Sequence, residues 1–385
     1  MIEIASLKER ELLVCKIPVR LDVQAVTELE KELHLDGVRE LVLDFSACTY
    51  VSSAGIRAIL KAYQVMTRSK GAMFSRNVGR DIYEVFETTG LAQIIGVEKA
   101  IREITLDGLE LISAGVCGEC YRIDHETVLK LYLEGVDPSV AEMEKRYAKA
   151  AFIMGVPTAV SYDLVRCGNR AGVIYEMLNA ELFSALIRQE PESLERHGQV
   201  LVRVAHILHG AKGDPSILPN MKERLRGYIR QMDEYLTEAE VEMLLRKLET
   251  VPDADTCVHF DLHTSNIMMQ GHEPVVIDMG DLSIGNRLFD IGWLYMIYGI
   301  PETGLCMMAT KIPNEIGYKF WNVLEDAFFP DKKSQEYRYF EENRYFLASL
   351  RVIYGMVFLP KVREVSLRWL RELLLPRISE AGQVS

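Results

Sequence analysis

The segment "HFDLHTSNIMMQ" (259–270) is followed after a short gap by "VVIDMGDLSIGNRLFDIG" (275–292), and together they carry closely spaced polar side chains. Four residues separate Asp261 from Asn266, and Asp278 ends an apolar strand pattern twelve residues after Asn266. Transfer of a phosphoryl group to a hydroxyl needs an acceptor for the hydroxyl proton, oxygen ligands for Mg²⁺ and cations on the phosphates. Asp261 can orient or deprotonate the hydroxyl, and Asn266 and Asp278 are hard oxygen donors. The spacing therefore predicts a phosphoryl-transfer loop, against the alternative of polar residues between core strands.

The same segment resembles the catalytic loop and metal-binding aspartate of the aminoglycoside phosphotransferase/choline kinase group, relatives of protein kinases. The pattern of that group is H-G-D-x-H-x-x-N, then I-D and a later D. Phe260 stands where the pattern has glycine, and we expect this change to affect substrate access without removing a functional atom. The resemblance implies that Asp261 and Asn266 are catalytic, that Asn266 and Asp278 bind Mg²⁺, and that ATP or GTP is the phosphate donor. The matching residues are His259, Asp261, His263, Asn266, Ile277, Asp278 and Asp290, with His259 and Asp290 in structural roles.

A kinase-like site also needs a strand lysine and a helix carboxylate that holds the lysine against the α- and β-phosphates. Lys130 lies in "TVLKLYL", a strand pattern, and Glu144 follows fourteen residues later in the predicted helix 139–155. Glu142 lies on a different face of that helix and is the second choice. Lys130 and Glu144 are therefore predicted to bind the nucleotide; the alternative for Lys130 is a solvated lysine on an edge strand.

Two further segments are candidates for nucleotide contacts. "SAGVCGECYRI" (113–123) supplies Gly115 and Gly118, which would let backbone N–H groups approach a phosphate closely. "VIYEMLNAE" (173–181) is expected to form the hinge that meets the adenine around Glu176 and Leu178. Neither segment has a side-chain signature that is specific by itself.

Two pairs of metal-ligand residue types need another explanation. Cys117-x-x-Cys120 has no second pair and falls inside the glycine-containing loop, which disfavours a zinc or redox site. We interpret His206-x-x-His209 as a packing or capping feature rather than a metal site.

The first hundred residues alternate strand and helix patterns, which indicates a small α/β domain. "LVLDFSACTYVSSAGIRAIL" (41–60) resembles the STAS domain of anti-sigma factor antagonists, and the resemblance extends over about residues 1–97. Ser53 corresponds to the phospho-acceptor of that family, at a helix start where a phosphate is tolerated. Ser52 replaces an aspartate of the family pattern and is a competing acceptor. An unmodified N-cap serine is the alternative.

From about residue 109 consecutive antiparallel strand patterns surround one helix, and from about 181 the pattern is mainly helical. We therefore predict an α/β STAS domain (mixed sheet with helices) followed by an α+β bilobal protein-kinase-like domain. The expected boundaries are 1–100 for the STAS-like regulatory domain, 101–180 for the kinase-like N-lobe and 181–385 for the helical C-lobe.

Composition limits the choice of environment and partner. The chain has 385 residues and a net charge of −12, concentrated after residue 107, which disfavours nucleic acid and is compatible with a cationic substrate. No stretch is long and apolar enough to suggest a membrane partner, and seven cysteines without a signal-peptide pattern favour a cytoplasmic protein.

Three functions fit these features. The first is an ATP- and Mg²⁺-dependent phosphotransferase acting on a hydroxyl of a small molecule, with a STAS module as regulator. The second is a signalling protein whose kinase-like domain phosphorylates a STAS serine or a partner protein. The third is a scaffold that only binds nucleotide; the joint presence of Lys130, Glu144, Asp261, Asn266 and Asp278 argues against it. An anti-sigma factor or another STAS-binding protein is the expected protein partner.

Overall fold

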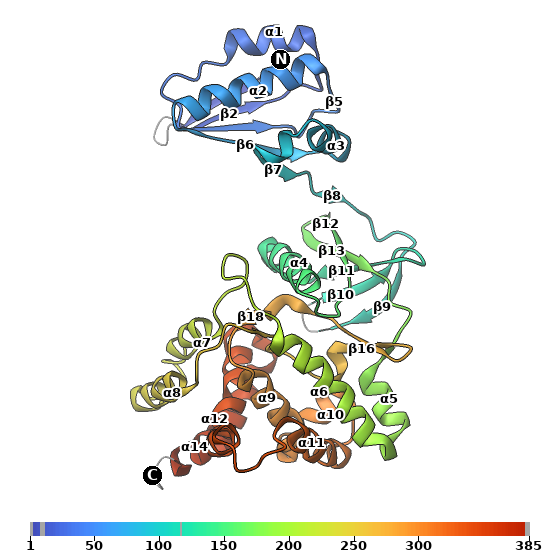
Figure 1. Cartoon of the computed structure of the whole chain (residues 1–385), viewed down its shortest axis with the longest axis vertical. Helices are drawn as coiled ribbons and strands as arrows, with labels where there is room; N and C mark the ends of the chain where they lie inside the picture. Colours follow the sequence, from blue (N-terminus) through green and yellow to red (C-terminus); the bar gives the residue numbers. More distant parts are fainter. Residues whose placement is uncertain (1–2, 8–11, 116–117, 382–385) are drawn as a thin grey trace. The chain divides into compact units, whose positions relative to one another are not determined.

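The computed structural model describes residues 3–7, 12–115 and 118–381, so Cys117 of the cysteine pair lies outside the described residues. The chain forms two compact units, residues 1–103 and 104–385. Each unit has a hydrophobic core of its own. Figure 1 shows the elements of both units in chain order.

The first unit is built on a five-stranded sheet in the order β1-β2-β4-β6-β7. The β1–β2 pair is antiparallel, and the pairs β2–β4, β4–β6 and β6–β7 are parallel. The bounds of its helices and main strands are β1 Glu3–Leu7, β2 Leu12–Lys16, α1 Val23–Glu32, β4 Glu40–Asp44, α2 Ser53–Arg68, β6 Ala72–Val78, α3 Arg80–Thr88 and β7 Gly96–Lys99. The short strands β3 (Arg20–Leu21) and β5 (Tyr50–Val51) pair with each other. The predicted mixed sheet with helices is confirmed.

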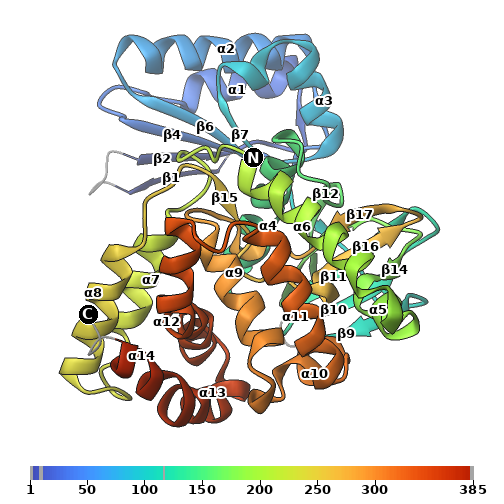
Figure 2. The same ribbon diagram turned by 60° about the horizontal axis from the view of Figure 1, so that its bottom comes forward.

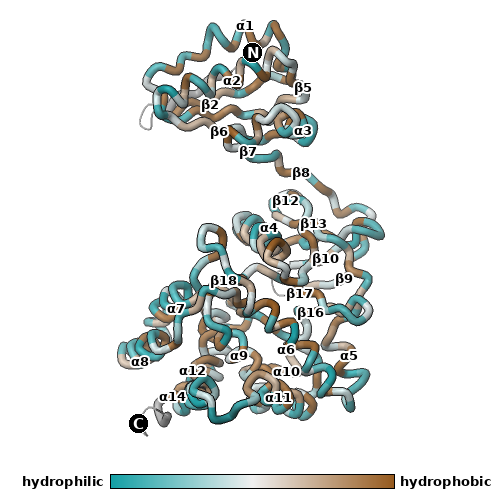
Figure 3. Tube along the Cα trace, in the orientation of Figure 1, coloured by the Kyte–Doolittle hydropathy of each residue, from teal (hydrophilic) through white to brown (hydrophobic). Residues whose placement is uncertain are grey.

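Helix α2 packs its apolar stripe against this sheet, and α1 lies beside it (Figure 2). Ile56, Ile59 and Met66 are buried at helical spacing, which accounts for the pattern seen in the sequence. Gly55 is needed at the start of the helix, because a Cβ there would lie 2.6 Å from the carbonyl oxygen of Leu21. Along the helices of both units, hydrophobic and hydrophilic segments alternate (Figure 3).

A buried carboxylate, that of Asp44, lies at the end of β4 and accepts several hydrogen bonds. Burial by itself would raise the pKa of Asp44, but hydrogen bonds from Asn77, Ser46 and Arg76 lower it to about 2. The stability that these contacts give is present above about pH 4, the ordinary range of an aspartate, and is lost as the pH falls toward 2. We expect Asp44→Asn to cost about 2 kcal/mol at pH 7 and about half of that at pH 3.

Calorimetric unfolding of the whole chain at the two pH values measures this difference. The exposed carboxylate of Glu30, 2.8 Å from Lys61, provides the control: Glu30→Gln should change stability by less than about 0.5 kcal/mol. An equal loss for Asp44→Asn at both pH values would contradict the assignment of the acid sensitivity to Asp44.

The second unit begins with a strand lobe, in which β12, β13, β11, β10 and β9 lie side by side in that order with antiparallel pairing. Their bounds are β9 Glu110–Ala114, β10 Gly118–Arg122, β11 Thr127–Tyr132, β12 Ser161–Cys167 and β13 Arg170–Glu176, and α4 (Pro138–Ile153) connects β11 to β12.

Helices make up most of the rest of the second unit, and a β-hairpin directly follows the predicted catalytic loop. The helices are α5 Phe183–Gln189, α6 Leu194–Gly210, α7 Met221–Arg230, α8 Glu238–Thr250, α9 Leu288–Leu294, α10 Leu305–Thr310, α11 Asn314–Phe328, α12 Gln335–Phe358, α13 Arg363–Trp369 and α14 Leu375–Ala381. The strands are β14 Glu181–Leu182, β15 Cys257–Val258, β16 Ile267–Gln270, β17 Glu273–Val276 and β18 Ser283–Ile284. A strand lobe followed by a helical lobe confirms the predicted bilobal arrangement.

Within the described part of the chain, no single helix has the length and hydropathy of a membrane span. Taken together, the helical segments Gln335–Phe358 and Pro360–Ile378 have the length and composition of a membrane span, but the chain bends by 119° between them.

Candidate active site

Lys130 lies at the centre of the strand-lobe half of the site. Its Nζ is 2.7 Å from Oε1 and 2.8 Å from Oε2 of Glu144, and 3.0 Å from Oδ1 of Asp278. Burial would lower the pKa of Lys130, but the carboxylates of Asp278 and Glu144 raise it well above its ordinary value. Tyr132 and Tyr175 donate hydrogen bonds to Glu144, so this carboxylate is held on several sides. Lys130 is therefore a fixed cation at the junction of the two lobes.

The β16–β17 hairpin explains the spacing between the two proposed metal ligands. Asn266 directly precedes β16, and Asp278 follows β17 after one residue. The antiparallel pairing brings these ends together, and the backbone N–H of Ile277 donates to the carbonyl of Asn266 at 2.9 Å. A separation of twelve residues in the chain thus becomes adjacency in space.

The backbone of the predicted catalytic loop is held by Asp290, which is fully buried in the first turn of α9. Its carboxylate accepts the N–H groups of His259 at 3.0 Å and Phe260 at 2.5 Å, and it lies 2.9 Å from Nε2 of His209. His259 Nε2 lies 3.1 Å from the carbonyl oxygen of Ile277, which connects the loop to the residue before Asp278. These contacts hold the loop without taking part in chemistry.

Phe260 takes a backbone conformation that suits glycine. Its φ is 65°, in the left-handed region that costs a residue with a side chain roughly 1–3 kcal/mol. The ring is 1% exposed and packs edge-on against Tyr354, with ring centroids 5.9 Å apart. The side chain therefore belongs to the core, and any effect of Phe260 on substrate access, which stays a prediction, would be indirect.

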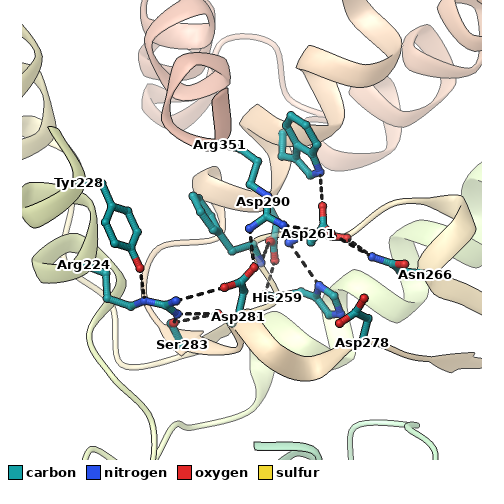
Figure 4. A network of polar contacts seen from close by, with 12 residues as sticks. Arg224, Tyr228, His259, Asp261, Asn266, Asp278, Asp281, Ser283, Asp290 and Arg351 are labelled. Atoms are coloured by element: carbon teal, nitrogen blue, oxygen red, sulfur yellow. Dashed lines mark hydrogen bonds and ion pairs between the residues drawn. The ribbon is translucent and has the colours of Figure 1, made fainter. Parts of the chain in front are cut away.

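Asp261 is half-buried, and both of its carboxylate oxygens have donors (Figure 4). Trp293 Nε1 donates to Oδ1 at 2.9 Å, and Arg351 Nη2 lies 3.1 Å from Oδ2. Asn266 Nδ2 donates to the carbonyl of Asp261 at 2.9 Å. Since the amide nitrogen of Asn266 faces Asp261, its Oδ1 is turned away and is available as a ligand. The carboxylate is thus oriented by three side chains.

The donors fit a magnesium ion held partly by a nucleotide. Asp278, with φ 65°, presents a half-exposed carboxylate, and Lys130 lowers its pKa so that it is ionised. No cluster of three acidic, histidine or cysteine ligands occurs among the described residues. Mg²⁺ is commonly bound through one or two protein oxygens together with substrate phosphates, so Asn266 and Asp278 suffice.

Each of the two units matches a known family. Residues 108–312, more than half of the chain, match the model of the phosphotransferase enzyme family. The chain belongs to the phosphotransferase enzyme family. Residues 8–104 match the model of the STAS domain, as the segment around Ser53 predicts. A search of curated protein sequences found no match.

Among solved structures, a thermostable mutant of aminoglycoside phosphotransferase APH(4)-Ia shares 12% identity; the alignment covers 72% of this chain and 94% of that chain, with a TM-score of 0.49. A choline/ethanolamine kinase family protein from Mesorhizobium loti shares 14% identity; the alignment covers 72% of this chain and 87% of that chain, with a TM-score of 0.45. The anti-sigma factor antagonist SpoIIAA in its unphosphorylated form shares 16% identity; the alignment covers 26% of this chain and 89% of that chain, with a TM-score of 0.23.

Sequence reasoning missed four residues of this phosphotransferase site. Arg351 Nη1 lies 2.5 Å from Oδ2 of Asp281, whose other oxygen is 3.1 Å from Nη2 of Arg224. Burial would raise the pKa of Asp281, but Arg351 and Arg224 lower it. A charged residue inside the apolar run "FLASLRVIYGMVF" (346–358) was the available signal, because a buried charge needs a partner. The four missed residues are Arg224, Asp281, Trp293 and Arg351.

The predicted nucleotide-binding residues of the strand lobe include two glutamates and two glycines. Glu142 is exposed on α4, whereas Glu144 is buried against Lys130. Gly118 lies in β10 rather than in a loop, and a Cβ there would meet the carbonyl oxygen of Leu131 at 2.6 Å, so close strand approach already requires a glycine. Gly115 donates its N–H to Gly118 at 2.8 Å.

Other predictions concern the hinge and the histidine pair. Glu176 ends β13, and Leu178 is half-buried two residues later. His206 packs edge-on against Phe328 at 6.3 Å, while His209 contacts Asp290. Our interpretation of the histidine pair omitted the contact of His209 with Asp290, the residue that holds the loop.

The two serines of the STAS unit differ in availability. Ser52 is the N-cap of α2: its hydroxyl accepts from the N–H of Gly55 at 3.2 Å and donates to the carbonyl of Leu21 at 3.0 Å. Ser53 is the exposed first residue of the helix. A phosphate on Ser53 would meet the N-terminus of a helix without breaking a cap, whereas one on Ser52 would displace it.

Proposed function

We propose that the chain transfers the γ-phosphoryl group of ATP to a hydroxyl of a small molecule in a Mg²⁺-dependent reaction. One observation carries this proposal: Lys130 contacts both Glu144 and Asp278. The cation for the phosphates and the carboxylate for the metal therefore lie next to each other, although 148 positions separate them in the chain. Membership of the phosphotransferase enzyme family supports the same reaction type.

In the proposed reaction, each residue of the site has a separate role. The acceptor hydroxyl donates its hydrogen bond to Asp261, and its oxygen forms the new bond to the γ-phosphorus as the bond to the β-phosphate oxygen breaks. ADP leaves, and the hydroxyl proton passes to Asp261 and then to water. Lys130, held by Glu144, pairs with the α- and β-phosphates. Mg²⁺, held by Asn266 and Asp278, would neutralise charge on the β- and γ-phosphate oxygens.

The test is transfer of label from γ-labelled ATP in the presence of Mg²⁺, with a panel of hydroxyl compounds that includes cationic and uncharged acceptors. The whole chain is compared with Lys130→Met and with a sample that contains EDTA. We expect labelled small-molecule product or labelled phosphate with the wild type alone. Absence of nucleotide binding by the wild type would refute the proposal.

A second candidate is favoured by the exposure of Ser53 at the start of α2. In this alternative the kinase-like unit phosphorylates a STAS serine, in its own chain or in a partner such as an anti-sigma system protein. The same assay distinguishes it: label on the protein that disappears with Ser53→Ala but persists with Ser52→Ala supports signalling. Label only on small molecules supports the first proposal.

A further inference from the structure

Arg351 is a buried cation that takes no direct part in the transfer steps. It lies on α12, is 9% exposed, and reaches from that helix toward the catalytic loop (Figure 4). Its Nη2 lies 3.1 Å from Oδ2 of Asp261, and its Nη1 lies 2.5 Å from Oδ2 of Asp281. One guanidinium thus bridges the carboxylate that would receive the acceptor proton and a second carboxylate three residues after Asp278.

Aromatic rings fix the plane of this guanidinium. Its carbon lies 4.1 Å from the ring centroid of Tyr354 and 5.1 Å from that of Phe260. A planar, five-donor group stacked in this way presents its N–H groups in set directions, which a lysine does not. These N–H groups point toward Asp261 and Asp281, so the aromatic contacts favour the orientation of the guanidinium that forms both ion pairs.

Arg351 and Trp293 together restrict the rotation of the Asp261 carboxylate. Trp293, on α9, donates to Oδ1 at 2.9 Å, while Arg351, on α12, engages Oδ2. Asn266 Nδ2 also donates to Oδ2, at 3.3 Å. A carboxylate has about four acceptor positions, so these three donors leave one for the hydroxyl of a substrate. Two helices thereby determine which lone pairs face the acceptor.

Asp281 extends this arrangement to the segment that carries Asp278. Its Oδ1 lies 3.1 Å from Nη2 of Arg224 on α7, and Arg224 Nη1 also donates to the hydroxyl of Ser283 at 2.9 Å. Because Arg224 pairs with Asp281 independently of Arg351, the segment that carries Asp278 keeps a cation partner when Arg351 is removed.

We propose that Arg351 is a positioning residue for Asp261, holding its carboxylate in the orientation that accepts the hydroxyl of the phosphate acceptor. This inference rests on the proposed phosphotransferase function. Binding of ATP is expected not to depend on Arg351, because Lys130, held by Glu144 in the strand lobe, would pair with the phosphates. Loss of Arg351 should thus affect kcat rather than the KM for ATP.

The kinetic experiment uses the whole chain with ATP and Mg²⁺ and measures ATP hydrolysis, in which water is the acceptor. For Arg351→Met we expect kcat to fall about 10²-fold, the size expected when a reacting group is misplaced by about 1 Å. KM for ATP should stay within about twofold. Arg351→Lys keeps a charge that can pair with one carboxylate at a time and should recover part of kcat. Arg363→Met is the control, since Arg363 binds the carbonyl of Met356 at 2.9 Å at the end of the same helix.

A second measurement does not depend on turnover. The indole N–H of Trp293 donates to Asp261, so its NMR signal in ¹⁵N-tryptophan protein reports the orientation of that carboxylate. The chain has three tryptophans, and Trp293→Phe assigns the signal. We expect Arg351→Met, and to a smaller extent Arg351→Lys, to move this signal while those of Trp321 and Trp369 stay in place.

The outcomes separate the two proposals. A lower kcat at unchanged KM together with a moved Trp293 signal supports the positioning role. An unmoved Trp293 signal in both variants overturns it, whatever happens to kcat. If the wild type does not hydrolyse ATP, the proposed function lacks support, and the Trp293 signal alone decides whether Arg351 orients Asp261.

Discussion

Asp261→Asn is expected to lower the rate of phosphoryl transfer from ATP by about 10³-fold, within the range usual for a residue that handles the reacting proton. The amide cannot receive the proton of the hydroxyl. Its NH₂ group would also face either the indole N–H of Trp293 or the guanidinium of Arg351, both of which are donors. The side chain therefore loses its orientation as well as its charge.

Initial rates with γ-labelled ATP, and separate measurement of ATP binding, check this prediction. Binding should be nearly unchanged, because Lys130 and Glu144 lie in the strand lobe. Asp255→Asn is the control: Asp255 is an exposed aspartate six residues earlier, 3.1 Å from Lys212. A loss of less than about tenfold in Asp261→Asn would remove Asp261 from the role of base.

The proximity of the proposed base and the proposed metal ligands was predictable because it is local. Asp261, Asn266 and Asp278 lie within eighteen residues, and one hairpin brings them together. In the family pattern, this hairpin corresponds to the number of residues between the asparagine and the second aspartate. The choice of Glu144 over Glu142 was likewise a local matter, since only one of them lies on the buried face of α4.

The part of the site that was not predicted consists of long-range contacts. Arg351 meets Asp281 across 70 positions of the chain, and its helix α12 is buried around much of its circumference in residues 346–356. This part of the helix has no polar face, so helical periodicity does not indicate what Arg351 contacts. The sequence indicates that a charge in this run needs a partner, but the choice among 56 acidic residues depends on the packing of α12 against α9.

Gly118 illustrates a different case, in which a glycine has two explanations. A glycine near a nucleotide loop suggests close approach of phosphate, yet Gly118 is paired with Tyr132 inside the β10–β11 ladder. Strand geometry alone requires a small residue there. A pattern of glycines therefore does not by itself separate a phosphate contact from close packing of two strands.

The largest effect on stability is expected from Asp290→Ala. Asp290 is fully buried and accepts from two backbone N–H groups and contacts His209, so alanine leaves three polar groups buried without their acceptor. We expect a loss of about 3–5 kcal/mol in the free energy of unfolding, the range for breaking a buried charged pair. Asp290→Asn retains one acceptor oxygen and should lose less.

This substitution should also reduce activity in the molecules that remain folded. The N–H of Phe260 bonds to Asp290 while Phe260 holds a φ of 65°, so the carboxylate helps to offset the cost of that conformation. Without it, Phe260 can relax to a negative φ and carry Asp261 out of the reach of Trp293. Unfolding of the whole chain in urea measures the stability loss, and a His209→Ala/Asp290→Ala double-mutant cycle isolates the side-chain contact. A loss below about 1 kcal/mol for Asp290→Ala would show that the loop keeps its backbone without this carboxylate.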